Sequence, residues 1–341
     1  MKTWRYVLAP LSIVYGIITY LRNLFYAVGL FKTNVLVGKS ITIGNLNAGG
    51  SGKSPLTLYL MRHLQHSFSI QVLSRGYGRK TRGHIALSHQ HRAEEVGDEP
   101  LLYKQWARAQ DEVHVAENRF TAIQTMNRSK DHVLLLDDAY QHRSVKAGLS
   151  IVVSAYDSPF FSDFLLPFGN LRELRSGVKR ADIVLYTKCP ETLTSENTRV
   201  HREKVEKYGI PCFFSRITYP ALAAMGSLEN DSPTHALVVT AIANPTPLYQ
   251  YLSKQYEIIP IPFSDHHAFT PQEIKEIHKK FDTFDPLKTI IITTEKDHMR
   301  LNSPGILELT TLYPWYVQPM SLAIEHEEAF LTLIENYVSK N

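Results

Sequence analysis

The chain has 341 residues, which is longer than a usual single hydrophobic core and predicts two domains. Hydrophobic residues make up 44% of the sequence, enough for two cores. The net charge of +4 suits phosphate ligands or an anionic membrane surface, but there is no long basic run of the type that binds nucleic acid, so no nucleic-acid partner is expected. Cys189 and Cys212 have no metal-like spacing, which predicts a reduced, intracellular protein without disulfides or structural zinc.

An apolar segment, residues 1–32, opens the chain. Aromatic and aliphatic side chains crowd the 16 residues between Arg5 and Arg22, which are fewer than the roughly 20 that a membrane-spanning helix needs. We therefore expect a helix that lies in the membrane interface, with nearby basic residues toward anionic lipid: Lys2, Arg5, Arg22 and Lys32. A signal peptide is disfavoured because no small-residue cleavage site follows. The alternative is an apolar helix packed on the rest of the protein.

The strongest motif is a glycine-rich loop between a predicted strand, Ile41–Ile43, and a predicted helix, Pro55–Gln65. Its backbone N–H groups and the dipole of the following helix suit phosphate, Lys53 can reach the β- and γ-phosphates, and Ser54 can bind Mg²⁺. The expected nucleotide-binding residues are Asn47, Ala48, Gly49, Gly50, Ser51, Gly52, Lys53 and Ser54.

One position departs from the strict phosphate-loop pattern. The residue five places before Gly52 is Asn47 rather than glycine, so we expect Gly49 and Gly50 to make the turn and Asn47 to tolerate left-handed backbone geometry. The alternative interpretation is a glycine-rich loop without a ligand. A Gly-Lys-Ser sequence at a strand-to-helix junction favours the phosphate site.

Two further strands are expected at Ile70–Ser74 and Asp131–Asp137. The second is followed directly by Asp138, and an apolar strand that ends in acidic residues downstream of a phosphate loop presents a carboxylate to nucleotide-bound Mg²⁺. We expect one of the two carboxylates to meet the metal and the other a water, a neighbouring group or the substrate. An ordinary turn with two aspartates is the alternative.

The alternation of strands and helices continues to residue 215. Strands at Leu149–Ser154 and Asp182–Thr187 predict a P-loop NTPase-like α/β domain of residues 33–215 with a doubly wound, mostly parallel sheet, whose ligands sit at the carboxyl ends of the strands. Residues 216–235 are expected to be a linker and residues 236–341 a smaller α/β domain. The expected elements of the second domain are strands Ala236–Thr240, Glu257–Ile261 and Thr289–Thr293 and helices Pro247–Gln255 and Pro271–Phe281.

Two clusters in the first domain suit an acceptor. Arg75 and Tyr77 follow a strand on a glycine frame and offer a positive charge and an aromatic surface to an anionic or sugar-like molecule; a solvated basic loop is the alternative. Asp98 and Glu99, in a predicted loop before a helix, are candidate general bases, because a kinase base must reach the acceptor hydroxyl.

Several ordered motifs extend this pattern along nearly the whole chain. They are Gly44-Asn45, Gly49–Pro55, Ser74–Gly78, Val96–Pro100, Leu136–Arg143, Leu171–Glu173, Asp265–His267 and Thr294–Asp297. Together they resemble the tetraacyldisaccharide 4′-kinase family of lipid A biosynthesis, in which Asn47 is itself part of the loop. Ala139-Tyr140 stands where the family often has Gly-Phe, and Ser54 stands where the family more commonly has Thr. The hydroxyl groups of both residue types can bind Mg²⁺.

The resemblance implies ATP-dependent phosphorylation, with Mg²⁺, of the 4′-hydroxyl of a tetraacylated glucosamine disaccharide 1-phosphate, giving a product of the lipid IVA type. It implies a location at the cytoplasmic face of the bacterial inner membrane. The expected partners are this lipid substrate and an anionic membrane surface, and no obligate protein partner is inferred.

The resemblance also implies roles for single residues. The catalytic base falls on Asp98 and its partner on His266, a dyad formed across the two domains, while Lys53 and Arg172 act on the transferred phosphate. The metal site falls on Ser54, Asp137 and Asp138. The residues expected around the transferred group or the acceptor are Arg75, Tyr77, Glu99, Gln141, His142 and Glu173.

Two other classes share part of the pattern. A SIMIBI-like P-loop GTPase or metallochaperone would need a carboxylate where the Thr187–Pro190 segment has Pro190, or metal-ligand clusters that the sequence lacks. A non-catalytic, nucleotide-binding membrane adaptor would need neither Asp98 nor His266. A transfer assay separates these alternatives from a kinase.

Overall fold

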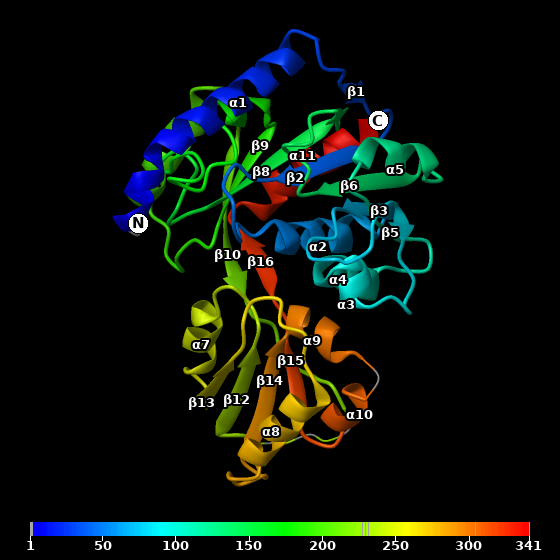
Figure 1. The fold of residues 1–341 in the computed structure, drawn as a ribbon, viewed down its shortest axis with the longest axis vertical. Coiled ribbons are helices and arrows are strands. Elements are labelled where there is room, and N and C mark those ends of the chain that lie inside the picture. The colour runs from blue at the N-terminus through cyan, green and yellow to red at the C-terminus, as the bar shows by residue number, and fades with distance from the viewer. Residues whose placement is uncertain (1–2, 227, 229, 231, 304, 341) are drawn as a thin grey trace.

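The computed structural model describes residues 3–226, 228, 230, 232–303 and 305–340. Within these residues the chain forms two bodies, each built around a sheet, and the end of β10 and the start of β16 connect them (Figure 1). The larger sheet has nine strands in the described residues, in the order β16 (Ser321–Ile324), β10 (Cys212–Thr218), β9 (Ile183–Thr187), β8 (Leu149–Ala155), β2 (Ser40–Gly44), β6 (His132–Asp137), β3 (Ser69–Ser74), β5 (Glu112–Val115) and β4 (Ile85–Ala86).

The strands from β10 to β5 are parallel, and β16 and β4 are antiparallel at the two edges. β2 and β9 are buried at every position, as expected for central strands that helices cover on both faces. The doubly wound, mostly parallel sheet is thereby confirmed. The helices of this body are α2 (Lys53–Leu64), α3 (Ala93–Val96), α4 (Asp98–Trp106), α5 (Arg119–Thr125), α6 (Ser195–Glu206), α11 (Glu327–Lys340) and the short 3₁₀ helix η2 (Arg175–Arg180), beside a small pair of β1 (Asn34–Val35) and β7 (Val145–Lys146).

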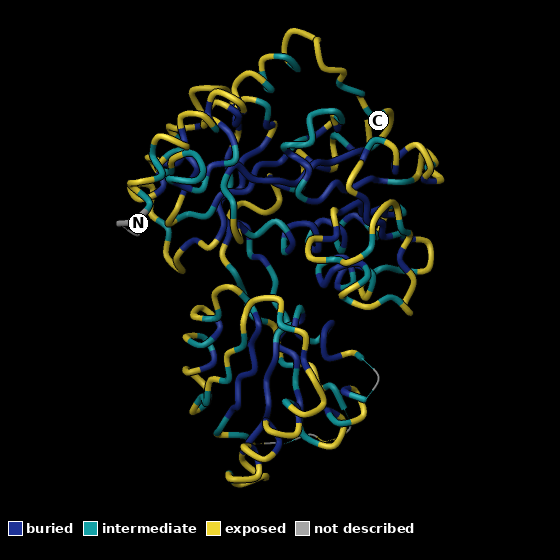
Figure 2. Tube along the Cα trace, viewed as in Figure 1, coloured by how far each residue is buried: buried dark blue, intermediate teal, exposed yellow. Residues whose placement is uncertain are grey.

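The smaller sheet has the order β11 (Ala223–Ala224), β15 (Trp315–Gln318), β14 (Thr289–Thr294), β12 (His235–Thr240) and β13 (Glu257–Pro262). Its helices are α7 (Thr246–Leu252), α8 (Pro271–Phe281), α9 (Glu295–Leu301) and α10 (Leu307–Thr310). β12, β13 and β14 lie within one residue of their predicted bounds, and α8 begins and ends where predicted. β13 can hold two prolines because it is an edge strand, where a missing N–H breaks no ladder. Figure 2 shows the strands of both sheets as the buried core.

The C-terminal boundary of the second domain differs from the prediction. β16 leaves the smaller body and pairs antiparallel with β10, so that Leu322 and Ile324 are buried in the core of the larger body. α11 then packs beside α2, where Tyr59 donates a hydrogen bond to Glu327 over 2.5 Å and His63 contacts Glu335 over 2.7 Å. Residues 321–340 therefore belong with the first domain, contrary to the expected 236–341 division.

The N-terminal segment forms the 3₁₀ helix η1 (Thr3–Leu8) and α1 (Ala9–Ala27), which lies along the larger body (Figure 1). The helical stretch Arg5–Ala27 has 23 residues and a mean hydropathy of 1.4, long and apolar enough to cross a membrane by length and composition alone. The apolar stretch of 16 residues counted between Arg5 and Arg22 was therefore shorter than the helix, because the helix continues past Arg22 to Ala27.

The buried face of α1 is made of small and polar residues: Ser12, Gly16 and Thr19. Ser12 Oγ donates a hydrogen bond to the carbonyl oxygen of Leu165 over 3.2 Å, and a Cβ atom on Gly16 would lie 2.8 Å from the Leu165 side chain. The apolar residues of the helix point outward, so α1 is largely exposed in Figure 2. The polarity is the reverse of that of an ordinary surface helix.

Candidate active site

The glycine-rich loop connects β2 to α2 at the carboxyl ends of the parallel strands. Gly52 has a left-handed backbone with φ of 91°, and a Cβ atom there would lie 3.2 Å from the side chain of Thr187. Thr187 donates a hydrogen bond to the carbonyl oxygen of Ser51 over 2.6 Å. Gly49 also has a positive φ, of 111°. Backbone geometry therefore requires both glycines, and β9 holds the loop from one side.

Asn47 does not have the left-handed backbone expected for it; in the described chain, Asp138, Lys188, His266 and His326 are the residues other than glycine with a positive φ. Instead, the backbone of Asn47 forms a β-bridge with Leu171, and its side chain donates a hydrogen bond to Asp163 over 2.8 Å. Arg172 N also donates to the carbonyl oxygen of Leu46 over 2.8 Å. Asn47 therefore ties the loop to the segment that carries Arg172.

Lys53 and Arg172 converge on Asp138. Lys53 Nζ lies 3.7 Å from Oδ1 of Asp138, and Arg172 donates a hydrogen bond to the same oxygen over 2.8 Å. Burial raises the pKa of Asp138, but the charges of Lys53 and Arg172 outweigh it and lower the pKa from its usual value. The φ of Asp138 is 45°, and this left-handed conformation is unfavourable in free energy for a residue that has a Cβ atom. The ionised carboxylate thus holds two cations beside the phosphate loop.

Asp137 is buried and surrounded by hydroxyl groups. Ser74, Thr57 and Tyr103 contact its carboxylate over 3.0, 3.4 and 3.2 Å. Burial, together with the nearby charges of Glu99 and Asp138, raises the pKa of Asp137 to about 6. This concentration of negative charge favours a cation at the end of β6.

Ser54 and Glu99 are in direct contact. Ser54 Oγ donates a hydrogen bond to Glu99 over 2.5 Å, and Lys296 of α9 forms an ion pair with the same carboxylate oxygen. Burial lowers the pKa of Lys296, but the charges of Glu99 and Asp98 outweigh it and raise the pKa. Glu99 therefore links the smaller domain to the serine that is predicted to bind metal.

The predicted metal residues fit Mg²⁺. Ser54, Asp137 and Asp138 offer oxygen ligands, which this ion prefers. Within the described residues, no group of three or more His, Cys, Asp or Glu side chains could hold a metal by itself. A site with few protein carboxylates is typical of Mg²⁺ that also binds nucleotide phosphates.

The sequence had indicated that Asp98 and Glu99 lie in a loop before a helix. In the structure they are instead the first two residues of α4. Gly97, with φ of 91°, separates α3 from α4, so the chain turns without a longer loop. A Cβ atom on Gly97 would lie 3.1 Å from the carbonyl oxygen of Tyr77. A glycine here brings the first turn of α4 against the loop that carries Arg75 and Tyr77.

The structure brings Asp98 of the first domain to His266 of the second. Oδ2 of Asp98 lies 3.5 Å from Nδ1 of His266, and Asp98 is 5% exposed. Arg300 of α9 forms an ion pair with the same Oδ2, and its Nη2 lies 3.1 Å from His266 Nδ1. Burial raises the pKa of Asp98, but the contact with His266 and the charges of Arg300 and Lys296 lower it below its usual value. The contact with Asp98 in turn raises the pKa of His266.

Gln141 and Glu173 lie behind Arg172. Gln141 donates hydrogen bonds to the carbonyl oxygen of Asn45 over 2.7 Å and to Glu173 over 3.1 Å. Glu173 is fully buried and also accepts hydrogen bonds from Asn23 of α1 over 2.9 Å and from Arg180 over 2.8 Å. These contacts make Glu173 a support that joins α1 to the site.

Arg75, Tyr77 and His142 lie at the ends of β3 and β6. Tyr77 is 74% exposed, and its ring centre lies 5.8 Å from that of His266. Burial and the charges of Arg119 and Arg75 lower the pKa of His142 to about 4, so its ring is neutral at neutral pH. The Nε2 atom of His142 is buried without a hydrogen-bond partner in the part of the chain that the structure describes.

Comparison with known proteins identifies the family. Residues 4–339 match the family model described as tetraacyldisaccharide-1-P 4′-kinase. A tetraacyldisaccharide 4′-kinase of Flavobacterium johnsoniae is 37% identical, with 100% of this chain and 99% of that protein covered. One of Phocaeicola vulgatus is 36% identical, covering 100% and 96%. The chain belongs to the tetraacyldisaccharide 4′-kinase family.

The fold of a family member has been solved. The crystal structure of LpxK from Aquifex aeolicus, titled as an "apo" form in complex with ATP, matches with a TM-score of 0.74 and 26% identity, covering 98% of this chain and 100% of that one. Members of the tetraacyldisaccharide 4′-kinase family are phosphotransferases with an alcohol group as acceptor, and they act in lipid A biosynthesis. The resemblance in the motifs is therefore confirmed over the whole length.

The structure brings three positively charged side chains to the site for which the sequence analysis had predicted no role. Arg300 and Lys296 lie on α9, and buried Arg119 begins α5. Lys296 belongs to the Thr294–Asp297 motif, which had no assigned role, and Arg300 follows it by one helical turn. A predicted helix from Thr294 would have indicated that Lys296 and Arg300 share a face.

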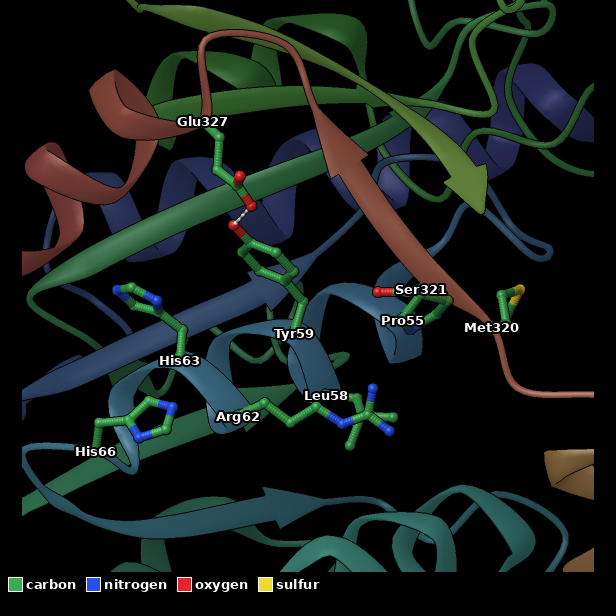
Figure 3. A pocket seen from close by; sticks show the side chains of 9 residues that line it. All are labelled: Pro55, Leu58, Tyr59, Arg62, His63, His66, Met320, Ser321 and Glu327. Carbon is green, nitrogen blue, oxygen red and sulfur yellow. Dashed lines mark hydrogen bonds between the residues drawn. The ribbon is translucent and has the colours of Figure 1, made fainter. Parts of the chain in front are cut away.

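A separate cavity of about 240 Å³ lies between α2, β16 and α11 (Figure 3). It is lined by Pro55, Leu58, Tyr59, Arg62, His63, His66, Met320, Ser321 and Glu327. None of these is a predicted site residue. The cavity therefore marks the junction where the C-terminal strand and helix return to the first domain.

Proposed function

We propose that this chain transfers the γ-phosphate of ATP to the 4′-hydroxyl of a tetraacyl glucosamine disaccharide 1-phosphate. The observation that carries the proposal is the contact of Asp98 with His266, formed between two domains in a chain whose phosphate loop carries Lys53. A protein that only binds nucleotide needs no such pair of groups. Membership of the family supports the acceptor.

Each cation and carboxylate has a task in this reaction. Lys53 and Arg172, which Asp138 holds beside the loop, would stabilise the charge on the transferred phosphoryl group. The acceptor hydroxyl has a pKa far above neutrality, so Asp98 would accept its proton as the bond to phosphorus forms. His266 would orient Asp98 and share its charge. Alignment by the two domains contributes as much as the base.

Mg²⁺ would be held by Ser54 and by Asp137 or Asp138. When bound, it would neutralise charge on the nucleotide phosphates. We expect a chelator such as EDTA to abolish phosphate transfer and added Mg²⁺ to restore it. Transfer that persists in EDTA after dialysis would contradict the metal requirement.

The direct test of the function is transfer of labelled γ-phosphate. ATP and, in parallel, GTP are supplied to the purified full chain with lipid A disaccharide 1-phosphate in mixed micelles. A labelled lipid with a 4′-phosphate is the expected product. Absence of labelled lipid, with nucleotide binding intact, would favour the adaptor; hydrolysis of GTP without lipid labelling would favour the GTPase class.

We infer that α1 holds the enzyme at an anionic membrane, at the cytoplasmic face of the inner membrane. Its polar face is occupied by the larger domain through Ser12, and Tyr15 donates a hydrogen bond to the carbonyl oxygen of Arg172 over 2.8 Å. A helix held lengthwise on its own domain cannot also cross the bilayer, so the exposed apolar face supports an interfacial position. The acceptor lipid would then meet the site at the membrane surface.

Ile17→Glu is expected to weaken binding to vesicles that contain phosphatidylglycerol by about tenfold or more, because a buried isoleucine contributes roughly 2 kcal/mol to membrane contact. Ile17 is 54% exposed, so the fold loses little. Vesicle sedimentation measures the effect. Val200→Glu on α6, at a 46% exposed position, is the matched control. Equal binding of the two variants would contradict a membrane role for α1.

A further inference from the structure

We infer that Arg300 is a positioning residue for the reaction: it holds the carboxylate of Asp98 in place from the second domain and keeps it bound to His266. The inference rests on the proposed kinase function, and it also gives a role to Asp297 of the Thr294–Asp297 motif, which holds Arg300. Asp98 contacts both Arg300 and His266. The ion pair with Arg300 is closer than the 3.5 Å contact with His266, and both engage Oδ2, so Arg300 is the nearer of the two partners.

The second domain fixes Arg300 rigidly. Nη1 of Arg300 donates hydrogen bonds to Asp297 over 2.7 Å and to the carbonyl oxygen of Ala241 over 2.8 Å. Asp297 is fully buried and accepts hydrogen bonds from the backbone of Ala241 and from Thr294. A guanidinium held on one side by these groups presents its other nitrogen in a fixed direction, which a flexible lysine does not do.

The same anchor also holds the histidine. The backbone N–H of His266 donates to the Ala241 carbonyl oxygen over 3.1 Å, so His266 and Arg300 share one acceptor at the end of β12. His266 has φ of 60°, a strained conformation that this bond helps to hold. Arg300 and His266 therefore form one rigid unit that meets Asp98.

α9 holds the first turn of α4 at two neighbouring points. Arg300 pairs with Asp98, while Lys296, one turn earlier, pairs with Glu99, which contacts Ser54. Removing one partner of such a buried pair leaves a charge uncompensated, so the two domains are coupled through the residues that flank the reaction. The base thus becomes correctly placed only when the second domain is docked.

The charged and titratable groups that face Asp98 come from three elements. α9 supplies Arg300, Lys296 and Asp297, the loop after β13 supplies His266 with Asp265 at 3.8 Å behind it, and α4 supplies Glu99. Arg300 lowers the pKa of Asp98 and also that of His266. Loss of the Arg300 charge must therefore raise the pKa of both groups.

Arg300→Gln tests the inference in the full-length protein. We expect kcat to fall by about 10- to 100-fold with the KM for ATP little changed, since the nucleotide loop is untouched. The acid limb of the pH profile of kcat/KM is expected to move to higher pH by about one unit or more, because Asp98 must be ionised to accept a proton and its pKa has risen. Arg300→Lys keeps the charge. We expect its acid limb to lie close to that of the unchanged protein, while its kcat stays lower.

A second readout does not depend on activity. The ring resonances of His266, assigned by comparison with His266→Gln, are titrated by NMR, and the pKa of His266 is expected to be higher in Arg300→Gln than in the unchanged protein. The matched control is Arg62→Gln. Arg62 also pairs with α9 across the domains, 3.7 Å from Glu295, and lines the cavity of Figure 3, whose lining residues do not include Asp98.

The outcomes are distinguishable. If Arg300→Gln is folded by circular dichroism but has the acid limb and the His266 titration of the Arg62→Gln control, Arg300 is a structural residue and the inference is overturned. If the unchanged protein transfers no phosphate, the proposed function fails, and the His266 titration still decides whether Arg300 acts on the pair.

Discussion

Asp98→Asn is expected to lower kcat for phosphate transfer by about 10²- to 10⁴-fold while ATP still binds, because the amide cannot accept the proton of the acceptor hydroxyl. Asparagine has the shape of aspartate, so the first turn of α4 and the contact with the Tyr77 loop are kept. Labelled γ-phosphate transfer measures kcat, and calorimetric titration measures ATP binding. The expected split between the two is the signature of a base.

The substitution also leaves Arg300 without its carboxylate partner in a buried place, which costs roughly 3–5 kcal/mol in comparable pairs. A matched control separates this loss of stability from the loss of chemistry. Asp111 is buried and pairs over 3.0 Å with Arg108, which is partly exposed, so Asp111→Asn removes a buried carboxylate from an ion pair that contains no site residue. We expect it to lower the melting temperature but not kcat. An Asp98→Asn variant within tenfold of the control in kcat would rule out Asp98 as the base.

Five neighbouring strands of the larger sheet, β9, β8, β2, β6 and β3, could be predicted because they are mostly apolar runs. Ile41–Ile43 lies inside β2, and Asp182–Thr187 begins one residue before β9; both strands are buried throughout. The return of β16 to this sheet was not predictable from Ser321–Ile324. Four residues with alternating burial give a weak pattern, and their partner β10 lies about a hundred residues earlier in the chain.

The face of α1 that contacts the rest of the protein could not be predicted from the sequence, for a different reason. Hydropathy reports how apolar a segment is, but not which face touches protein. Ser12, Gly16 and Thr19 follow helical spacing, and this face becomes the buried one through contacts that exist only in the fold, such as those of Ser12 with Leu165 and Phe168. A polar stripe on an apolar helix is therefore a better indication of protein contact than the count of apolar residues.

Within the site, the residues of the phosphate loop could be predicted from local chemistry, whereas the contact of Asp98 with His266 could not. The two lie far apart in sequence, and only the family resemblance joined them. Arg300 was missed because a lone arginine on a short helix has no signal of its own. Its role follows from Asp98, Asp297 and the Ala241 carbonyl, which meet only in the fold.

Lys53→Gln is expected to have an effect as large as the loss of the base, because Lys53 supplies a fixed positive charge where negative charge develops during transfer. Removal of one such group in a preorganised site costs about 10²- to 10³-fold in kcat. Asp138 would keep Arg172 as its partner, 2.8 Å away, so the carboxylate is not left unpaired and the fold should persist. The KM for ATP should also rise, since a lysine in this position contacts the phosphates of the bound nucleotide as well.

Lys39→Gln provides the control, because Lys39 precedes β2 at the opposite end from the phosphate loop and contacts the carbonyl oxygen of Lys130 over 2.5 Å. The same change of charge there should leave kcat and KM unchanged. A double variant, Lys53→Gln with Arg172→Gln, extends the argument. If both cations act on one transferred group, the double variant loses less than the product of the two single losses. Strictly multiplicative losses would show that Arg172 acts elsewhere, and that its contact with Asp138 only positions the carboxylate.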